Sequence, residues 1–140
     1  MTVKGVEMVE RGGAAYALIL RANASSSEKY NFLTDSQNPL QLGMNFYKQG
    51  ENIKAHYHLP RHIESDQVQE FLLIAAGRAR LTLFDASDQV PFDTLQLETG
   101  DMVLLLAGGH GLEIQEDTKI VEIKQGPYDG KTKDKVVFGA

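Results

Sequence analysis

The sequence predicts an all-β domain, arranged as an antiparallel sandwich or barrel. Nowhere in its 140 residues does an apolar pattern of helical period continue beyond a turn or two. About ten short apolar or alternating segments follow one another instead, with turn-favouring residues between them. An apolar fraction of 42% and a charged fraction of 24% are ordinary for one globular domain of this length.

The expected strands follow from alternation and from the turn residues that bound them. The clearest alternation runs from Leu40 to Gln49, and the most apolar run, MVLLL, ends at Leu106. Gly77 and the pair Glu116-Asp117 are expected to close hairpins, and residues 59–68 to form a loop over the mouth of a site. The expected strands cover residues 3–10, 14–21, 29–34, 40–49, 53–58, 70–76, 78–85, 92–97, 101–106, 112–115 and 120–124.

Charge and residue types disfavour several classes of function. A formal net charge of −5 argues against a nucleic-acid or anionic-membrane surface, and the lack of cysteine removes disulfides, thiolate zinc sites and a cysteine nucleophile. No apolar run reaches the ~18 residues of a membrane helix. The run Ala14 to Leu20 superficially resembles a signal sequence, but its leader is not net positive, so we interpret it as a buried strand. We expect a cytoplasmic protein.

The stretch from Gly50 to Gly77 holds three of the four histidines. His56 and His58 are two positions apart, so a strand over residues 53–58 would aim both imidazoles to one side. Glu70 begins a second apolar run, and its carboxylate would lie beside the two rings if that run were the antiparallel neighbour. This stretch therefore predicts a metal site.

The same stretch resembles the first motif of the cupin superfamily, G-x5-H-x-H-x3,4-E-x6-G. Gly50, His56, His58, Glu70 and Gly77 match every element except one gap, because eleven residues separate the second histidine from the glutamate. A longer loop accommodates that gap at small entropic cost. Glu64 is the competing acidic ligand, since it lies inside the gap. Glu70 is preferred because it has the motif's distance to a glycine and lies on an expected strand.

The second cupin motif, G-x5-P-x-G-x2-H-x3-N, is matched more loosely from Gly100 to His110. Leu106 stands in place of proline, one residue before the histidine is missing, and Ile114 occupies the asparagine position. The resemblance implies one domain over residues 1–140, with a double-stranded β-helix (jelly-roll) barrel at about 40–123. Residues 1–34 would add N-terminal strands, and residues 124–140 would close the barrel.

In the resemblance, His56, His58, Glu70 and His110 hold a divalent transition metal. Imidazole and carboxylate ligands admit Fe, Mn, Ni or Zn without selecting among them, and four protein ligands leave two octahedral positions open. The resemblance implies a small metal-dependent enzyme, which would be an isomerase, a lyase or a dioxygenase. Its substrate would be a polar metabolite, and a sugar-derived one is slightly favoured. The alternative is a non-catalytic module that binds a small ligand, with a structural or vestigial metal.

Several further residues remain open at this stage. Glu122 and Lys124 share one face of the last strand, where they could orient a ligand, serve acid–base chemistry, or form a cross-strand ion pair. His62 and Arg61 either reach a substrate or are solvated, and Tyr57 is expected to pack on the barrel. Residues 124–128 are either a lid or an ordinary closing loop. The resemblance also implies a homodimer, in which the run Ala14 to Leu20 pairs with a second copy.

Overall fold

The protein is all-β in a computed structural model that describes residues 3–139. Its elements in chain order are β1 (Val3–Arg11), β2 (Ala14–Ser26), β3 (Tyr30–Phe32), β4 (Gly43–Asn45), β5 (Glu70–Ala76), β6 (Arg78–Phe84), β7 (Pro91–Glu98), β8 (Met102–Leu105), β9 (Gly109–Ile114), β10 (Lys119–Lys124) and α1 (Lys131–Asp134). Among the described residues, no helix is long and apolar enough to cross a membrane.

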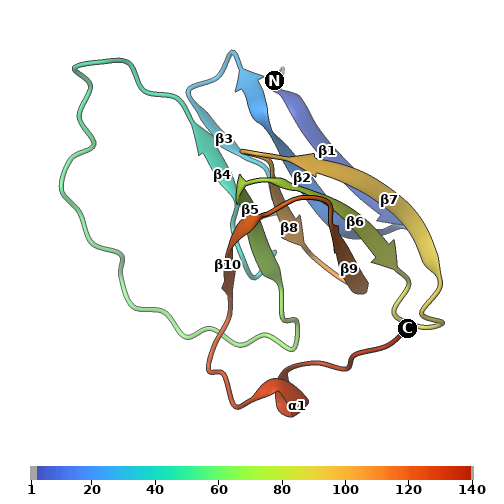
Figure 1. The fold of residues 1–140 in the computed structure, drawn as a ribbon. Helices are drawn as coiled ribbons and strands as arrows, with labels where there is room; N and C mark the ends of the chain where they lie inside the picture. The colour runs from blue at the N-terminus through green and yellow to red at the C-terminus, as the bar shows by residue number, and fades with distance from the viewer. Residues whose placement is uncertain (1–2, 140) are drawn as a thin grey trace.

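The strands form two main sheets and one short ribbon, all antiparallel (Figure 1). The large sheet has the order β1-β2-β8-β5-β10, the three-stranded sheet has the order β7-β6-β9, and β3 pairs with β4. From β5 onward the chain passes between the two main sheets at Gly77, Gly100 and the turns before β9 and β10. Side chains from both sheets meet in one core, formed by Ala17, Ile19, Leu72, Ile74, Leu81, Leu83, Leu97, Val103 and Leu105.

The two central strands, β2 and β8, are buried on both faces. The inner face of β2 contributes Ile19 to the core between the sheets, while Leu18 points to the other face and packs with Leu104 and Leu106. Residues 33–42 cover that outer face, through Leu33, Leu40 and Leu42 among others. A strand covered on both sides reads as a continuous apolar run, so the interpretation of residues 14–20 as a buried strand is confirmed. Because β2 pairs with β1 and with β8, it offers no free edge for the expected dimer contact.

Several expected local structures are wrong. Gly77 does not close a hairpin, because β5 pairs with β8 and β10 whereas β6 pairs with β7 and β9. The turn at Glu116-Asp117 likewise joins strands of different sheets. In the expected strand over residues 40–49, only Gly43–Asn45 pairs. All of these errors concern which strands pair with each other. Local alternation of apolar and polar residues cannot specify which distant strand a segment pairs with.

The expected strand over residues 53–58 is also absent from the structure. Residues 46–69 contain neither helix nor strand, and every residue from 45 to 68 is exposed. We call residues 46–68 the arm. It leaves the end of β4, runs to one side of the sheets and returns to the start of β5 (Figure 1). Tyr57, expected to pack on a barrel, is 83% exposed.

Candidate functional site

A pocket of about 450 Å³ opens between the large sheet and β9. The period of two along each strand selects its lining, since alternate residues face the same side. β5 contributes Glu70 and Leu72, β9 contributes His110 and Leu112, and β10 contributes Ile120, Glu122 and Lys124. Val68 of the arm, Leu105, Ala107 and Gly108 complete the wall with Asp134 and Lys135 from the C-terminal segment. Apolar side chains and a few convergent polar groups characterise small-molecule sites.

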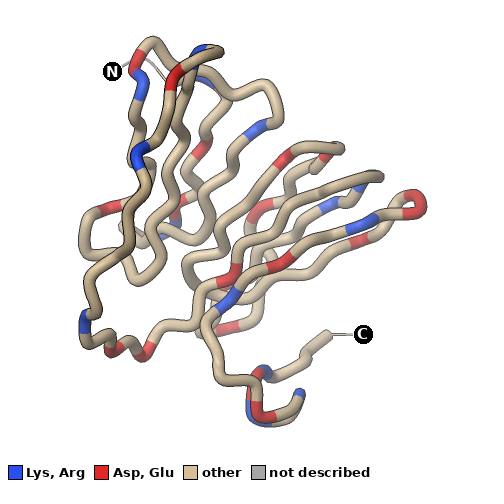
Figure 2. The backbone as a smooth tube through the Cα atoms, turned by 90° about the vertical axis from the view of Figure 1, so that its left-hand side faces the viewer, with Lys and Arg blue, Asp and Glu red and all other residues tan. Residues whose placement is uncertain are grey.

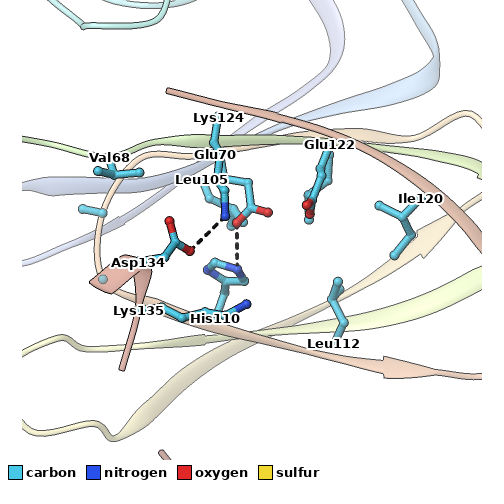
Figure 3. A pocket seen from close by; sticks show the side chains of 13 residues that line it. Val68, Glu70, Leu105, His110, Leu112, Ile120, Glu122, Lys124, Asp134 and Lys135 are labelled. Atoms are coloured by element: carbon cyan, nitrogen blue, oxygen red, sulfur yellow. Dashed lines mark hydrogen bonds and ion pairs between the residues drawn. The ribbon is translucent and has the colours of Figure 1, made fainter. Parts of the chain in front are cut away.

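Glu70 and His110 face each other across the pocket from different sheets (Figure 3). The glutamate Oε2 lies 3.2 Å from the histidine Nε2, and the two side chains are 19% and 34% exposed respectively. Glu70 begins β5 and lies opposite Lys124 in the β5–β10 register. His110 is the second residue of β9, between glycines. A Cβ at Gly108 would lie 2.6 Å from the Phe84 carbonyl oxygen, and Gly108 has φ +71°. The backbone before His110 thus requires glycine.

Glu122 is the diagonal neighbour of Glu70 on β10, because the register places Glu122 opposite Leu72. The two carboxyl groups are close enough to shift each other's pKa. The imidazole of His110 holds the pKa of Glu70 below its ordinary value, even though burial acts in the other direction. The side-chain interaction with Glu70, and the charge of Glu70, raise the pKa of Glu122. The two neighbouring carboxyl groups therefore have pKa values shifted in opposite directions.

Lys124 is the third polar side chain that the large sheet contributes to the pocket, next to Glu70 and Glu122. Its ammonium lies 2.9 Å from Asp134 Oδ2 on α1, and this hydrogen bond raises the pKa of Lys124. The ammonium also lies 5.4 Å from the ring centroid of Tyr128. Lys124 therefore connects the C-terminal segment to the last strand. The expectation that Glu122 and Lys124 share a face is confirmed, because both line the pocket, and the ion-pair partner of Lys124 is Asp134. The contribution of Asp134 and Lys135 was missed because the tail has no periodicity from which its position follows.

The other sequence-predicted ligands lie elsewhere. His56 and His58 are exposed in the arm, with ring centroids 5.3 Å apart, and His56 Nδ1 lies 2.8 Å from the Lys54 carbonyl oxygen. His62 and Glu64 pair with each other at 3.3 Å and are 83% and 85% exposed. Neither pair lines the pocket. Of the four expected metal ligands, the structure thus brings together Glu70 and His110.

We tested whether the donors that meet could hold a metal ion. Throughout residues 3–139, no group of three or more His, Cys, Asp or Glu side chains is arranged to bind one. Glu70 and His110 provide one oxygen and one nitrogen, and these two atoms already contact each other at 3.2 Å. The donor set as arranged here does not fit a transition-metal centre, because such centres take at least three protein ligands.

Fold and site together define an all-β protein of two facing antiparallel sheets, with a half-open pocket lined by carboxyl, imidazole and ammonium groups. Comparisons with family models, with curated proteins and with solved structures gave no match. The cupin resemblance therefore stands on the motif residues of the sequence alone.

Proposed function

We propose that the protein is an enzyme of the isomerase or lyase class that transfers protons to and from a small polar metabolite in the pocket. The observation that carries this proposal is the row Glu122, Glu70, His110, in which neighbours shift two carboxyl pKa values in opposite directions. Two titratable groups whose pKa values are pushed apart can serve as acid and base at the same pH. Glu122 is the proton donor in this assignment, and Glu70 with His110 is the proton acceptor.

The lining of the pocket defines the class of substrate. Carboxyl and ammonium groups on one wall and the imidazole on the facing wall suit a ligand with several hydroxyl or carbonyl oxygens, while Leu72, Leu105 and Leu112 cover its carbon skeleton. A sugar-derived carbonyl compound has both features, and its hydrogens next to the carbonyl are acidic enough for a carboxylate base. Lys124 would orient an oxygen atom of this ligand from the rim.

Solvent-isotope exchange tests the proposal without knowledge of the product. The protein is incubated in D₂O with a panel of aldoses, ketoses and sugar acids, and deuterium incorporation into each compound is followed by NMR. We expect incorporation at a carbon next to a carbonyl, and a loss of about 100-fold or more in Glu122→Gln. Glu113→Gln is the matched control, because Glu113 is exposed on β9 and does not line the pocket. Binding without exchange in any compound would overturn the enzymatic proposal and support a binding module.

A metal-dependent function is the second candidate, favoured by one observation. Two of the four expected ligands, Glu70 and His110, meet although they come from different sheets. This candidate requires His56 and His58 to move from the exposed arm to that pair. Elemental analysis of purified protein for Fe, Mn, Ni and Zn tests it. A stoichiometric ion that is lost both in His56→Ala/His58→Ala and in His110→Ala would support it, and binding insensitive to the arm histidines would contradict it.

A further inference from the structure

A second cavity, of about 990 Å³, adjoins the pocket at His110, and we call it the side cavity. The pocket and the side cavity have three lining residues in common, namely Gly108, His110 and Lys135. One wall of the side cavity is the glycine-rich start of β9, and the other is the C-terminal segment, residues 131–139. Because the two cavities meet at shared residues, a ligand held in the pocket can extend past His110 into the side cavity.

The C-terminal segment is held in place on both sides of Lys135. Asp134, directly before it, forms the ion pair with the last strand. After it, the ring of Phe138 packs edge-on against Phe84, with the ring centroids 5.2 Å apart. The same ring lies so close to Gly109 that a Cβ there would be 2.8 Å from it. Lys135 is therefore positioned at the junction of the two cavities by contacts on either side.

The side cavity is lined by basic residues and, within the described part of the chain, by no acidic one. Its charged groups are the ammonium groups of Lys131 and Lys135, which are both exposed. Among residues 3–139 no carboxylate forms an ion pair with either lysine. Figure 2 shows basic positions gathered around α1, and the described part of the segment has no acidic residue after Asp134. Two ammonium groups without a carboxylate partner create a local positive field that attracts anions.

The backbone of β9 adds a hydrogen-bond donor beside these lysines. The Gln115 amide donates to the Arg78 carbonyl oxygen at 3.1 Å, so this N–H points toward β6. N–H directions alternate along an antiparallel strand, and the β6–β9 register is unbroken, so the His110 amide points away from β6. It faces the sheet edge that the C-terminal segment borders, and no acceptor for it is found among the described residues. Ammonium and amide N–H groups together are typical ligands of carboxylate and phosphate oxygens.

We propose that the substrate of the pocket carries an oxyanion group, and that Lys135, with Lys131 and the His110 amide, binds this group in the side cavity. This inference rests on the proposed function, since it defines the substrate class of the same pocket. Lys135 lies beside His110, across the pocket from Glu70 and Glu122 (Figure 3). The two carboxyl groups repel an anionic end and the lysine attracts it, so the charges orient the substrate with its neutral carbonyl end toward Glu70 and Glu122.

Binding of small anions tests the side cavity without any reaction. Inorganic phosphate and, separately, acetate are titrated into ¹⁵N-labelled protein at low salt, and amide shifts are followed by NMR. We expect the amides of His110 and Gly111 to shift, and Lys135→Gln to weaken binding by at least about tenfold, since it removes a charge-assisted hydrogen bond. A comparison of the two anions shows whether phosphate or carboxylate is preferred. If neither anion shifts these amides, the anion site is overturned.

Lys133→Gln is the matched control for the titration. Lys133 belongs to the same helix, is exposed and lines neither of the two cavities, so this variant changes the net charge equally without touching the side cavity. We expect it to bind phosphate like the natural protein. Equal weakening in Lys133→Gln and Lys135→Gln would overturn the proposal, because it would show a general effect of charge.

Isotope exchange then tests the substrate class with three matched compounds: a neutral hexose, its uronic acid and its 6-phosphate. We expect faster exchange in one of the two anionic compounds than in the neutral hexose. For that compound, Lys135→Gln should raise KM by at least about tenfold with a smaller change in kcat, and leave exchange of the neutral hexose unchanged. Equal exchange in all three compounds would overturn the inference and leave the enzymatic proposal intact. If no compound exchanges while phosphate binding still depends on Lys135, the enzymatic proposal fails and the anion site stands.

Discussion

Glu70 Oε2 lies 3.2 Å from His110 Nε2, and this contact links the first residue of β5 to β9 of the opposite sheet. The pair is ionic when the imidazole is protonated, and it is only partly exposed, so solvent screens it less than a surface pair. This contact with His110 is the main cause of the lowered pKa of Glu70.

The contact predicts an acid-sensitive contribution to stability. The pKa of Glu70 is lowered in the folded protein, so its ionised form stabilises the fold at pH values above the ordinary glutamate pKa of 4.5. That stabilisation is lost as the pH falls through the lowered pKa. In urea denaturation at a series of pH values, Glu70→Gln should therefore be less stable than the natural protein near neutrality, and the difference should shrink in acid. In Glu113→Gln, the exposed control, such a pH-dependent difference is not expected.

Glu122 should show the opposite dependence. Its pKa is raised by the side-chain interaction with Glu70 and by the charge of Glu70, so its stabilising contribution is present below the ordinary pKa and is lost as the pH rises through the raised value. Carboxyl-detected NMR titration measures this directly. We expect the pKa of Glu122 to lie above 4.5 in the natural protein and to fall in Glu70→Gln. An unchanged Glu122 pKa in that variant would show that another group causes the shift.

The sequence predicted the central strands well, because burial on both faces leaves a continuous apolar run. Residues 17–20 and 103–105 are such runs, and both form the middle of the large sheet. The proximity of Glu70 to His110 was also predicted, although through a family motif. The alternation of His56 and His58 was insufficient to predict a strand. A strand forms only where its backbone groups hydrogen-bond to a neighbouring strand, and among residues 3–139 this segment has no such neighbour. Long-range pairing of this kind is not encoded locally.

Gly77 was correctly predicted to lie in a turn, but the turn joins strands of two different sheets and does not close a hairpin. It has φ +100°, and a Cβ there would lie 2.6 Å from the Asp117 carbonyl oxygen, where the chain passes between sheets. Gly77→Ala should lower the free energy of unfolding by more than about 1 kcal/mol, since both the conformation and the space oppose a side chain. Thermal and urea denaturation measure the loss. Gly12→Ala, where φ is also positive but nothing lies within 4 Å, separates the conformational part from the steric part. Equal losses would contradict the steric contribution.

Asp101 is the buried polar group on which the junction of β2, β7 and β8 depends. Its side chain is 7% exposed and accepts hydrogen bonds from Arg21 at 3.0 Å, from the Ala22 amide at 2.9 Å and from the Glu98 amide at 2.8 Å. Asp101→Ala would leave two backbone donors and a half-buried guanidinium without this acceptor, so we expect a loss of at least about 2 kcal/mol in the free energy of unfolding.

Urea denaturation of Asp101→Ala beside Asp93→Ala provides the comparison. Asp93 is exposed and its side chain accepts a hydrogen bond from the neighbouring Thr94 amide, so its removal should change stability by less than about 0.5 kcal/mol. Arg21→Ala measures how much the ion pair between Arg21 and Asp101 contributes to stability. Because Asp101 keeps both amide donors when the guanidinium is gone, Arg21→Ala should cost less than Asp101→Ala. The reverse order would mean that the ion pair, and not the satisfaction of the backbone, dominates at this junction.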